Sequence, residues 1–113
     1  MSFKVKENYG AIVIELKGKL EGGSLSSEMS ETLYRSLDQG KKNVVVDLGG
    51  ISYINSSGLG ILISGLASMK KNGGDLKLAN INNKVQGLLS ITKLNQIFEQ
   101  FDSVDAAVKS FAK

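Results

Sequence analysis

The 113-residue sequence contains no cysteine, histidine, proline or tryptophan. Without cysteine the chain can form no disulfide, and it offers neither a thiolate nucleophile nor a thiolate metal ligand. Without histidine it lacks the usual general base and the commonest metal-binding side chain. These absences exclude a serine nucleophile activated by histidine. We therefore expect no enzymatic activity, no metal and no cofactor.

Positive charge is present but dispersed. The formal net charge is +3, the lysines are scattered from Lys4 to Lys113, and Arg35 is the only arginine. Nucleic-acid-binding proteins usually gather basic side chains on one face, with arginines for bidentate contacts and aromatic rings for stacking. Aromatic residues make up only 6% of this chain. The composition predicts no direct binding of nucleic acid.

Long apolar runs are also missing. The N-terminal segment MSFKVKENYG lacks the apolar stretch of a signal peptide, and glycines and serines interrupt the apolar region at residues 59–69. That region is too short to cross a bilayer. Hydrophobic residues at 42% and charged residues at 22% are ordinary for a globular protein. We expect one domain, residues 1–113, in the cytoplasm and without membrane association.

The first half of the sequence predicts two strands, a helix and a buried strand. Phe3 and Val5 alternate with lysines, and the turn residues 8–10 separate them from a β-branched run at 11–16. Leucine or methionine recurs every four residues over 25–37, which predicts a helix, with Ser24 placed to cap it and Gly40 to end it. NVVVDL, residues 43–48, is typical of a parallel strand buried on both faces.

The second half of the sequence continues to alternate between predicted strands and helices. Gly49-Gly50 predict a turn before an extended segment at 51–54 and a helix at about 56–71, ended by residues 72–74. A short strand in DLKLANI, a helix at 84–94, an extended passage at 97–101 and a last helix opening at Ser103 follow. This order predicts an α/β sandwich: a small, four- to five-stranded mixed sheet with about four helices packed against it.

Ser56 and Ser57 stand where a strand turns into an apolar helix, and three interpretations of them are open. Either serine could cap the helix by accepting a hydrogen bond from a backbone N–H. The segment SSGLG could cradle phosphate, but its next glycine, Gly65, has the wrong spacing for a dinucleotide loop, and no Lys-Ser or Lys-Thr pair follows. A phosphoryl group could be added at the helix N-terminus, where N–H groups and the helix dipole favour its charge of roughly −2.

Carboxylate chemistry is a weaker possibility. Asp47 could pair with Glu15 or Glu21 for acid–base catalysis. Eleven carboxylates scattered over a small domain would, however, produce such pairs by chance. Solvated surface is the expectation for these residues.

The segment VVVDLGGISYINSSGLGILISGLASMKKNGGDLKLANI closely resembles the signature of the STAS domain family of bacterial anti-sigma factor antagonists. GKLEG at 18–22 stands where the family has Gly-x-Leu/Ile-Asp, and Gly73-Gly74 precede the next strand. The resemblance covers essentially the whole chain. It implies a STAS-like fold.

The resemblance also implies a role in partner switching. Such antagonists bind an anti-sigma factor that is often a serine kinase; phosphorylation of the first serine in the motif, here Ser56, dissociates the complex, and a phosphatase of the PP2C type resets it. The positions matching the family's docking face predict the following partner-binding residues: Leu20, Glu21, Gly22, Gly23, Ser24, Asn55, Ser56, Ser57, Gly58, Leu59, Gly60 and Leu62.

The chain departs from the family pattern at two positions. Asn55 replaces the acidic residue before the phosphorylated serine, and Glu21 replaces an aspartate in the loop before the first helix. Asn55 keeps a side chain that can hydrogen-bond to the backbone but lacks the charge. Two alternatives therefore stay open: a phosphorylation-independent STAS module in a larger signalling assembly, and a nucleotide-binding domain.

Overall fold

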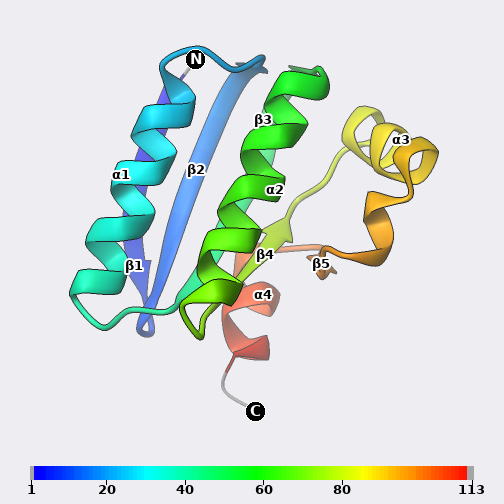
Figure 1. Ribbon diagram of the computed structural model, residues 1–113. Coiled ribbons are helices and arrows are strands. Elements are labelled where there is room, and N and C mark those ends of the chain that lie inside the picture. The colour runs from blue at the N-terminus through cyan, green and yellow to red at the C-terminus, as the bar shows by residue number, and fades with distance from the viewer. Residues whose placement is uncertain (1, 112–113) are drawn as a thin grey trace.

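The computed structural model describes residues 2–111, so both ends of the expected domain range, Met1 and residues 112–113, lie outside the described part. A five-stranded mixed sheet runs through the molecule (Figure 1) in the order β1-β2-β3-β4-β5. Its strands are β1 (Ser2–Asn8), β2 (Ala11–Leu20), β3 (Asn43–Ile54), β4 (Asp75–Ala79) and β5 (Gln100–Phe101). β1 is antiparallel to β2, and each later pair is parallel.

Three helices connect the parallel strands: α1 (Leu25–Asp38), α2 (Ser56–Lys71) and α3 (Asn83–Thr92), the last followed by a short 3₁₀ helix at Leu94–Gln96. A fourth helix, α4 (Val104–Ser110), follows β5. The predicted α/β sandwich with a small mixed sheet is thereby confirmed. None of the helices within residues 2–111 is long and apolar enough to cross a membrane.

The main core lies between the sheet and the helices α1, α2 and α3. The predicted apolar positions of α1 and α2 face it, and inward side chains of β2, β3 and β4 complete it: Leu25, Met29, Leu33, Leu59, Leu62, Leu66, Met69, Ile14, Leu16, Val44, Val46 and Leu78. Figure 1 shows α1 and α2 side by side over the sheet, with α3 on the side of α2 away from α1. Helix α2 therefore lies between α1 and α3.

A second, smaller core lies on the opposite face of the sheet, under α4. Its buried members are Ala11, Val13, Val45, Ala79, Ala107 and Val108. Lys77 of β4 is buried beside it. The Lys77 Nζ donates to Ser110 Oγ at 2.7 Å, pairs with Glu99 at 2.9 Å and lies 4.2 Å from the centroid of the Phe111 ring. This lysine joins β4 to α4 and to the segment before β5.

The predicted turn at Gly49-Gly50 is wrong, because β3 continues through both glycines to Ile54. The register against β2 shifts twice, once between Glu15 and Lys17 and once between Gly18 and Lys19, and β3 has one extra residue at each shift. An extra residue bulges a strand without ending its pairing. A Cβ at Gly50 would lie 2.5 Å from the Lys17 side chain of β2, so this glycine permits close strand pairing.

The helix ends agree partly with the sequence. Gly40 and Gly73 follow α1 and α2 with positive φ, as predicted for helix C-termini. Ser103 caps α4 by accepting a hydrogen bond from Ala106 N at 3.1 Å. Ser24 precedes α1 but has helical φ and ψ and makes no capping hydrogen bond, so its predicted cap is wrong. A residue that caps through its side chain normally has an extended backbone.

Candidate functional site

The turn between β3 and α2 is organised by Asn55. Its backbone is extended, and its Oδ1 accepts a hydrogen bond from Gly58 N at 2.9 Å. This is the geometry of a helix N-cap. The proposal that a serine caps this helix is therefore corrected: α2 begins at Ser56, and the residue before it provides the cap.

Ser56 and Ser57 are exposed at the first turn of α2. Within residues 2–111 neither hydroxyl makes a hydrogen bond to another protein group. Helix geometry also leaves the N–H groups of these two residues without an intrahelical acceptor. The turn thus presents two free hydroxyls where the helix dipole favours negative charge.

The loop before α1 lies directly against this turn. Asn55 N donates to the carbonyl oxygen of Leu20 at 3.3 Å, and a Cβ built on Gly58 would lie only 2.0 Å from that same oxygen. A Cβ on Gly22 would approach the Ser57 Cβ to 3.3 Å. The two segments that the sequence predicts as docking elements are therefore adjacent, and glycine permits the contact.

Together these segments form an open hollow of about 380 Å³. It is lined by small and apolar residues from the loop, α1 and α2: Gly22, Gly23, Ser26, Ser57, Gly60, Ile61 and Ser64. None of these side chains carries a charge, whereas phosphate-binding sites usually combine backbone N–H groups with lysine or arginine. The hollow therefore resembles a surface for another protein more than a nucleotide cradle.

Four residues of the predicted partner-binding set are buried. Gly58 is buried against the end of β2, and the side chains of Leu20, Leu59 and Leu62 lie in the main core. A partner could touch the three leucine side chains only by opening the core, so they support the surface from below. The exposed members nearest the turn are Ser56, Ser57, Glu21, Gly23 and Ser24, and Asn55, Gly22 and Gly60 are half-buried.

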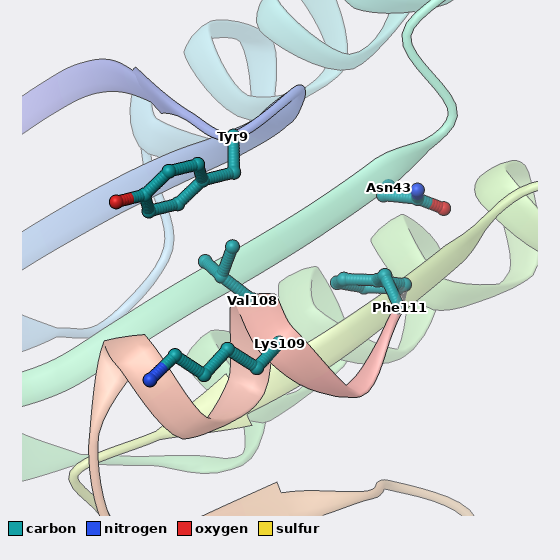
Figure 2. Close-up of a pocket in the computed structure, with 5 residues that line it drawn as sticks. All are labelled: Tyr9, Asn43, Val108, Lys109 and Phe111. Carbon is teal, nitrogen blue, oxygen red and sulfur yellow. The ribbon is translucent and has the colours of Figure 1, made fainter. Parts of the chain in front are cut away.

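A separate hollow of about 320 Å³ lies far from the turn. Figure 2 shows Tyr9 from the β1–β2 turn and Asn43 at the start of β3 on one side, with Val108, Lys109 and Phe111 of the α4 segment on the other. It is on the α4 face, at the end of the sheet where the parallel strands begin. Since Ser56 follows the far end of β3, this hollow has no part in the candidate site.

Two of the three carboxylates considered for catalysis, Asp47 and Glu15, have structural roles, and the third, Glu21, is exposed. Asp47 Oδ1 accepts hydrogen bonds from Gly49 N and Asn80 Nδ2, both at 3.0 Å. The ammonium groups of Lys6 and Lys17 lie 3.3 Å and 3.5 Å from Glu15 and hold the pKa of that carboxyl below its usual value. Among the described residues, no group of three or more acidic side chains is placed to hold a metal ion.

Substitution of Asn55 tests the cap directly. Asn55→Ala is expected to lower the free energy of unfolding by about 1 kcal/mol, because Gly58 N loses its acceptor. Asn55→Asp is expected to keep the cap and to add about 0.5 kcal/mol at neutral pH, because a carboxylate suits the positive end of the helix dipole. Urea denaturation followed by circular dichroism measures both.

Ser57→Ala is the matched control, since the Ser57 side chain is exposed and outside the cap; its change is expected to stay within about 0.5 kcal/mol. If Asn55→Ala is as stable as this control, the Asn55 cap contributes nothing.

The sequence did not identify one neighbour of the site. Helix α3 lies beside the end of β3, where Asn82 Nδ2 donates to Ile51 O at 2.6 Å and Lys84 Nζ donates to Ser52 O at 3.2 Å. One signal was available in the sequence: Ile91, an apolar residue of the predicted helix. It is 82% exposed.

Similarity to known proteins agrees with this geometry. The chain is 32% identical over 95 residues to the anti-sigma-B factor antagonist of Bacillus subtilis (strain 168), covering 84% of this chain and 85% of that protein. The crystal structure of an anti-sigma factor antagonist from Mycobacterium paratuberculosis matches with a TM-score of 0.83 at 19% identity, covering 99% of this chain and 94% of the other.

Bacillus SpoIIAA shares the fold in both of its forms. The unphosphorylated structure gives a TM-score of 0.71 at 17% identity, covering 98% of this chain and 97% of that one. The phosphorylated structure gives 0.75 at 16% identity, covering 97% and 99%. The family model for the STAS domain matches residues 2–107. By fold and by sequence, this chain belongs to the STAS domain family.

Proposed function

We propose that this chain is an anti-sigma factor antagonist that works by partner switching. It binds an anti-sigma factor that is also a serine kinase, through the exposed residues of the β3–α2 turn and of the loop before α1. Phosphorylation of Ser56 ends the complex, and a phosphatase of the PP2C type restores it. The names of the relatives support the general role, and the geometry of the turn supports the place of the switch.

The observation that carries the proposal is that two adjacent residues, Asn55 and Ser56, have different roles at the turn. Asn55 caps α2, so the Ser56 hydroxyl is exposed and free to react. A phosphoryl group there would meet the unpaired N–H groups of the first helical turn, and the fold would tolerate it. A docked partner would instead face a hydrated charge of roughly −2. Only the partner's affinity needs to change.

Labelling tests the switch. Incubation with ATP and each serine-kinase anti-sigma factor of the source genome is expected to add one phosphoryl group, seen by intact-mass spectrometry. Ser56→Ala is expected to remove the label, whereas Ser57→Ala, the neighbouring exposed serine, is expected to keep it. Equal labelling rates for wild type and Ser56→Ala would contradict the assignment.

Asn55 favours a second candidate, a phosphorylation-independent STAS module. The turn lacks the acidic side chain that the family pattern places before the serine. In that case wild type is expected to bind its partner yet stay unlabelled, and Asn55→Asp, which keeps the cap, is expected to become a substrate. Labelling of wild type would favour the switch.

A further inference from the structure

Apolar side chains gather on the outer side of α3. Ile91 is 82% exposed, Tyr53 is 45% exposed, and Leu88 is half-buried between them and the core. They line an open hollow of about 420 Å³ that Gly87 also borders. We call Tyr53, Gly87, Leu88 and Ile91 the α3 surface. Exposed apolar clusters of this kind often mark protein interaction sites.

The fold does not require the exposed part of this surface, Ile91 and Gly87. The inward stripe of α3 consists of Val85 and Leu89, both fully buried, so Ile91 adds nothing to the core. Gly87 lies in the middle of the helix, where glycine is less favourable than alanine. A Cβ built there would meet no atom within 4 Å, and no positive φ requires glycine. The missing side chain keeps the hollow open at the expense of helix stability.

The α3 surface is continuous with the β3–α2 turn. Tyr53 and Ile54 directly precede Asn55 and Ser56 along the chain, and both line the hollow beside Gly87. The hydrogen bonds from Asn82 and Lys84 to the β3 carbonyls fix α3 against this strand end. A protein that covers Ser56 therefore has the apolar hollow within the same footprint.

The surrounding charge is positive. Lys84 and Lys93 stand at the two ends of α3, and Lys19 is the register partner of Tyr53 on the neighbouring strand. Over residues 2–111 none of these three lysines forms a salt bridge. Between Asp47 and Glu99 the sequence has only one acidic residue, Asp75, and it pairs with Lys70. An acidic partner is therefore favoured.

We propose that the α3 surface is the apolar half of the docking site for the anti-sigma factor, which inserts an apolar side chain flanked by carboxylates. This inference rests on the proposed function and specifies the chemistry of its partner. The β3–α2 turn carries the switch, and the α3 surface supplies affinity that does not depend on Ser56.

Calorimetric titration of the unphosphorylated protein with its anti-sigma factor tests the inference. Ile91→Asp, which puts a charge into the hollow, and Gly87→Gln, which fills it, are each expected to weaken binding by about tenfold or more. Lys93→Glu is expected to weaken binding and to reduce its dependence on salt concentration. Thermal melting checks that every variant is folded.

Tyr34→Ser is the matched control, because Tyr34 is a 59% exposed aromatic on α1, on the other side of α2. Its affinity is expected to stay within about twofold of wild type. If both Ile91→Asp and Gly87→Gln bind with wild-type affinity, the docking role of the α3 surface is overturned, while the proposed function still stands. If the wild-type protein forms a dimer and Ile91→Asp dissociates it, the surface binds a second copy of this chain, and the anti-sigma factor docking site is overturned. Failure of wild type to bind any anti-sigma factor would overturn the proposed function and this docking site with it.

Discussion

Replacing Gly58 with alanine is expected to lower the free energy of unfolding by about 3 kcal/mol or more. The new Cβ would lie 2.0 Å from the carbonyl oxygen of Leu20 and 2.6 Å from its carbonyl carbon. Both atoms belong to the backbone at the end of β2, so no side-chain rotation relieves the clash. Alanine favours a helix by about 1 kcal/mol over glycine, which is too little to compensate.

Gly60→Ala, two residues further along α2, is the control for this prediction. A Cβ there would meet no atom within 4 Å, so the helix preference alone applies, and a change of about 1 kcal/mol or less toward higher stability is expected. Denaturation in guanidinium chloride, followed by circular dichroism, compares the two variants. A Gly58→Ala protein as stable as Gly60→Ala would mean that α2 and β2 are not in close contact.

The Gly58 substitution should also affect function. To relieve the clash, α2 has to move away from Leu20, which breaks the alignment between the β3–α2 turn and the loop at Gly22-Gly23. Under the proposed function, partner affinity is then expected to fall even for the fraction that remains folded. Gly60→Ala leaves this alignment in place.

Replacing Lys77 with alanine is expected to lower the free energy of unfolding by about 2 kcal/mol. The change removes the hydrogen bond to Ser110, the contact with the Phe111 ring and the buried aliphatic stem. The cost stays below that of stranding a buried charge, because the Glu99 side chain is 62% exposed and is rehydrated. Hydrogen exchange in α4 is expected to quicken, since Lys77 connects that helix to β4.

Two further variants separate packing from charge. Lys77→Met keeps most of the stem and is expected to cost about 1 kcal/mol or less. Lys109→Ala removes an exposed lysine of α4 and is expected to change stability by no more than about 0.5 kcal/mol. If Lys77→Ala behaves like Lys109→Ala, the buried lysine does not hold α4 in place.

Much of the architecture could be predicted because the pattern of apolar residues is local. The four-residue recurrence in α1 and the valine run in β3 each indicate one type of element, and a helix between two strands, here β2 and β3, predicts that they pair in parallel. Gly49-Gly50 misled the prediction because a glycine pair is typical of turns. Whether it forms a turn or a bulged strand depends on pairing with β2, about 30 residues away, and single-sequence reasoning does not detect that pairing.

The candidate site was predictable in position but not in detail. Asn55, Ser56 and Ser57 are all good N-cap residues, so local preference does not choose among them. The choice of Asn55 depends on where β3 ends, and in the structure this strand ends at Ile54. The burial of Leu20, Leu59 and Leu62 and the exposure of Ile91 likewise depend on how the helices pack on the sheet.

The edges of the sheet restrict how a partner can bind. β5 has only two residues, and β1 is an edge strand that carries the exposed lysines Lys4 and Lys6. Short edge strands and edge lysines disfavour the addition of another strand, whether from a second protein or from an aggregating copy. β-augmentation, a common way to recognise extended peptides, is thus disfavoured for this molecule. Its partners are left to recognise side chains, whose chemistry can be changed by a single modification.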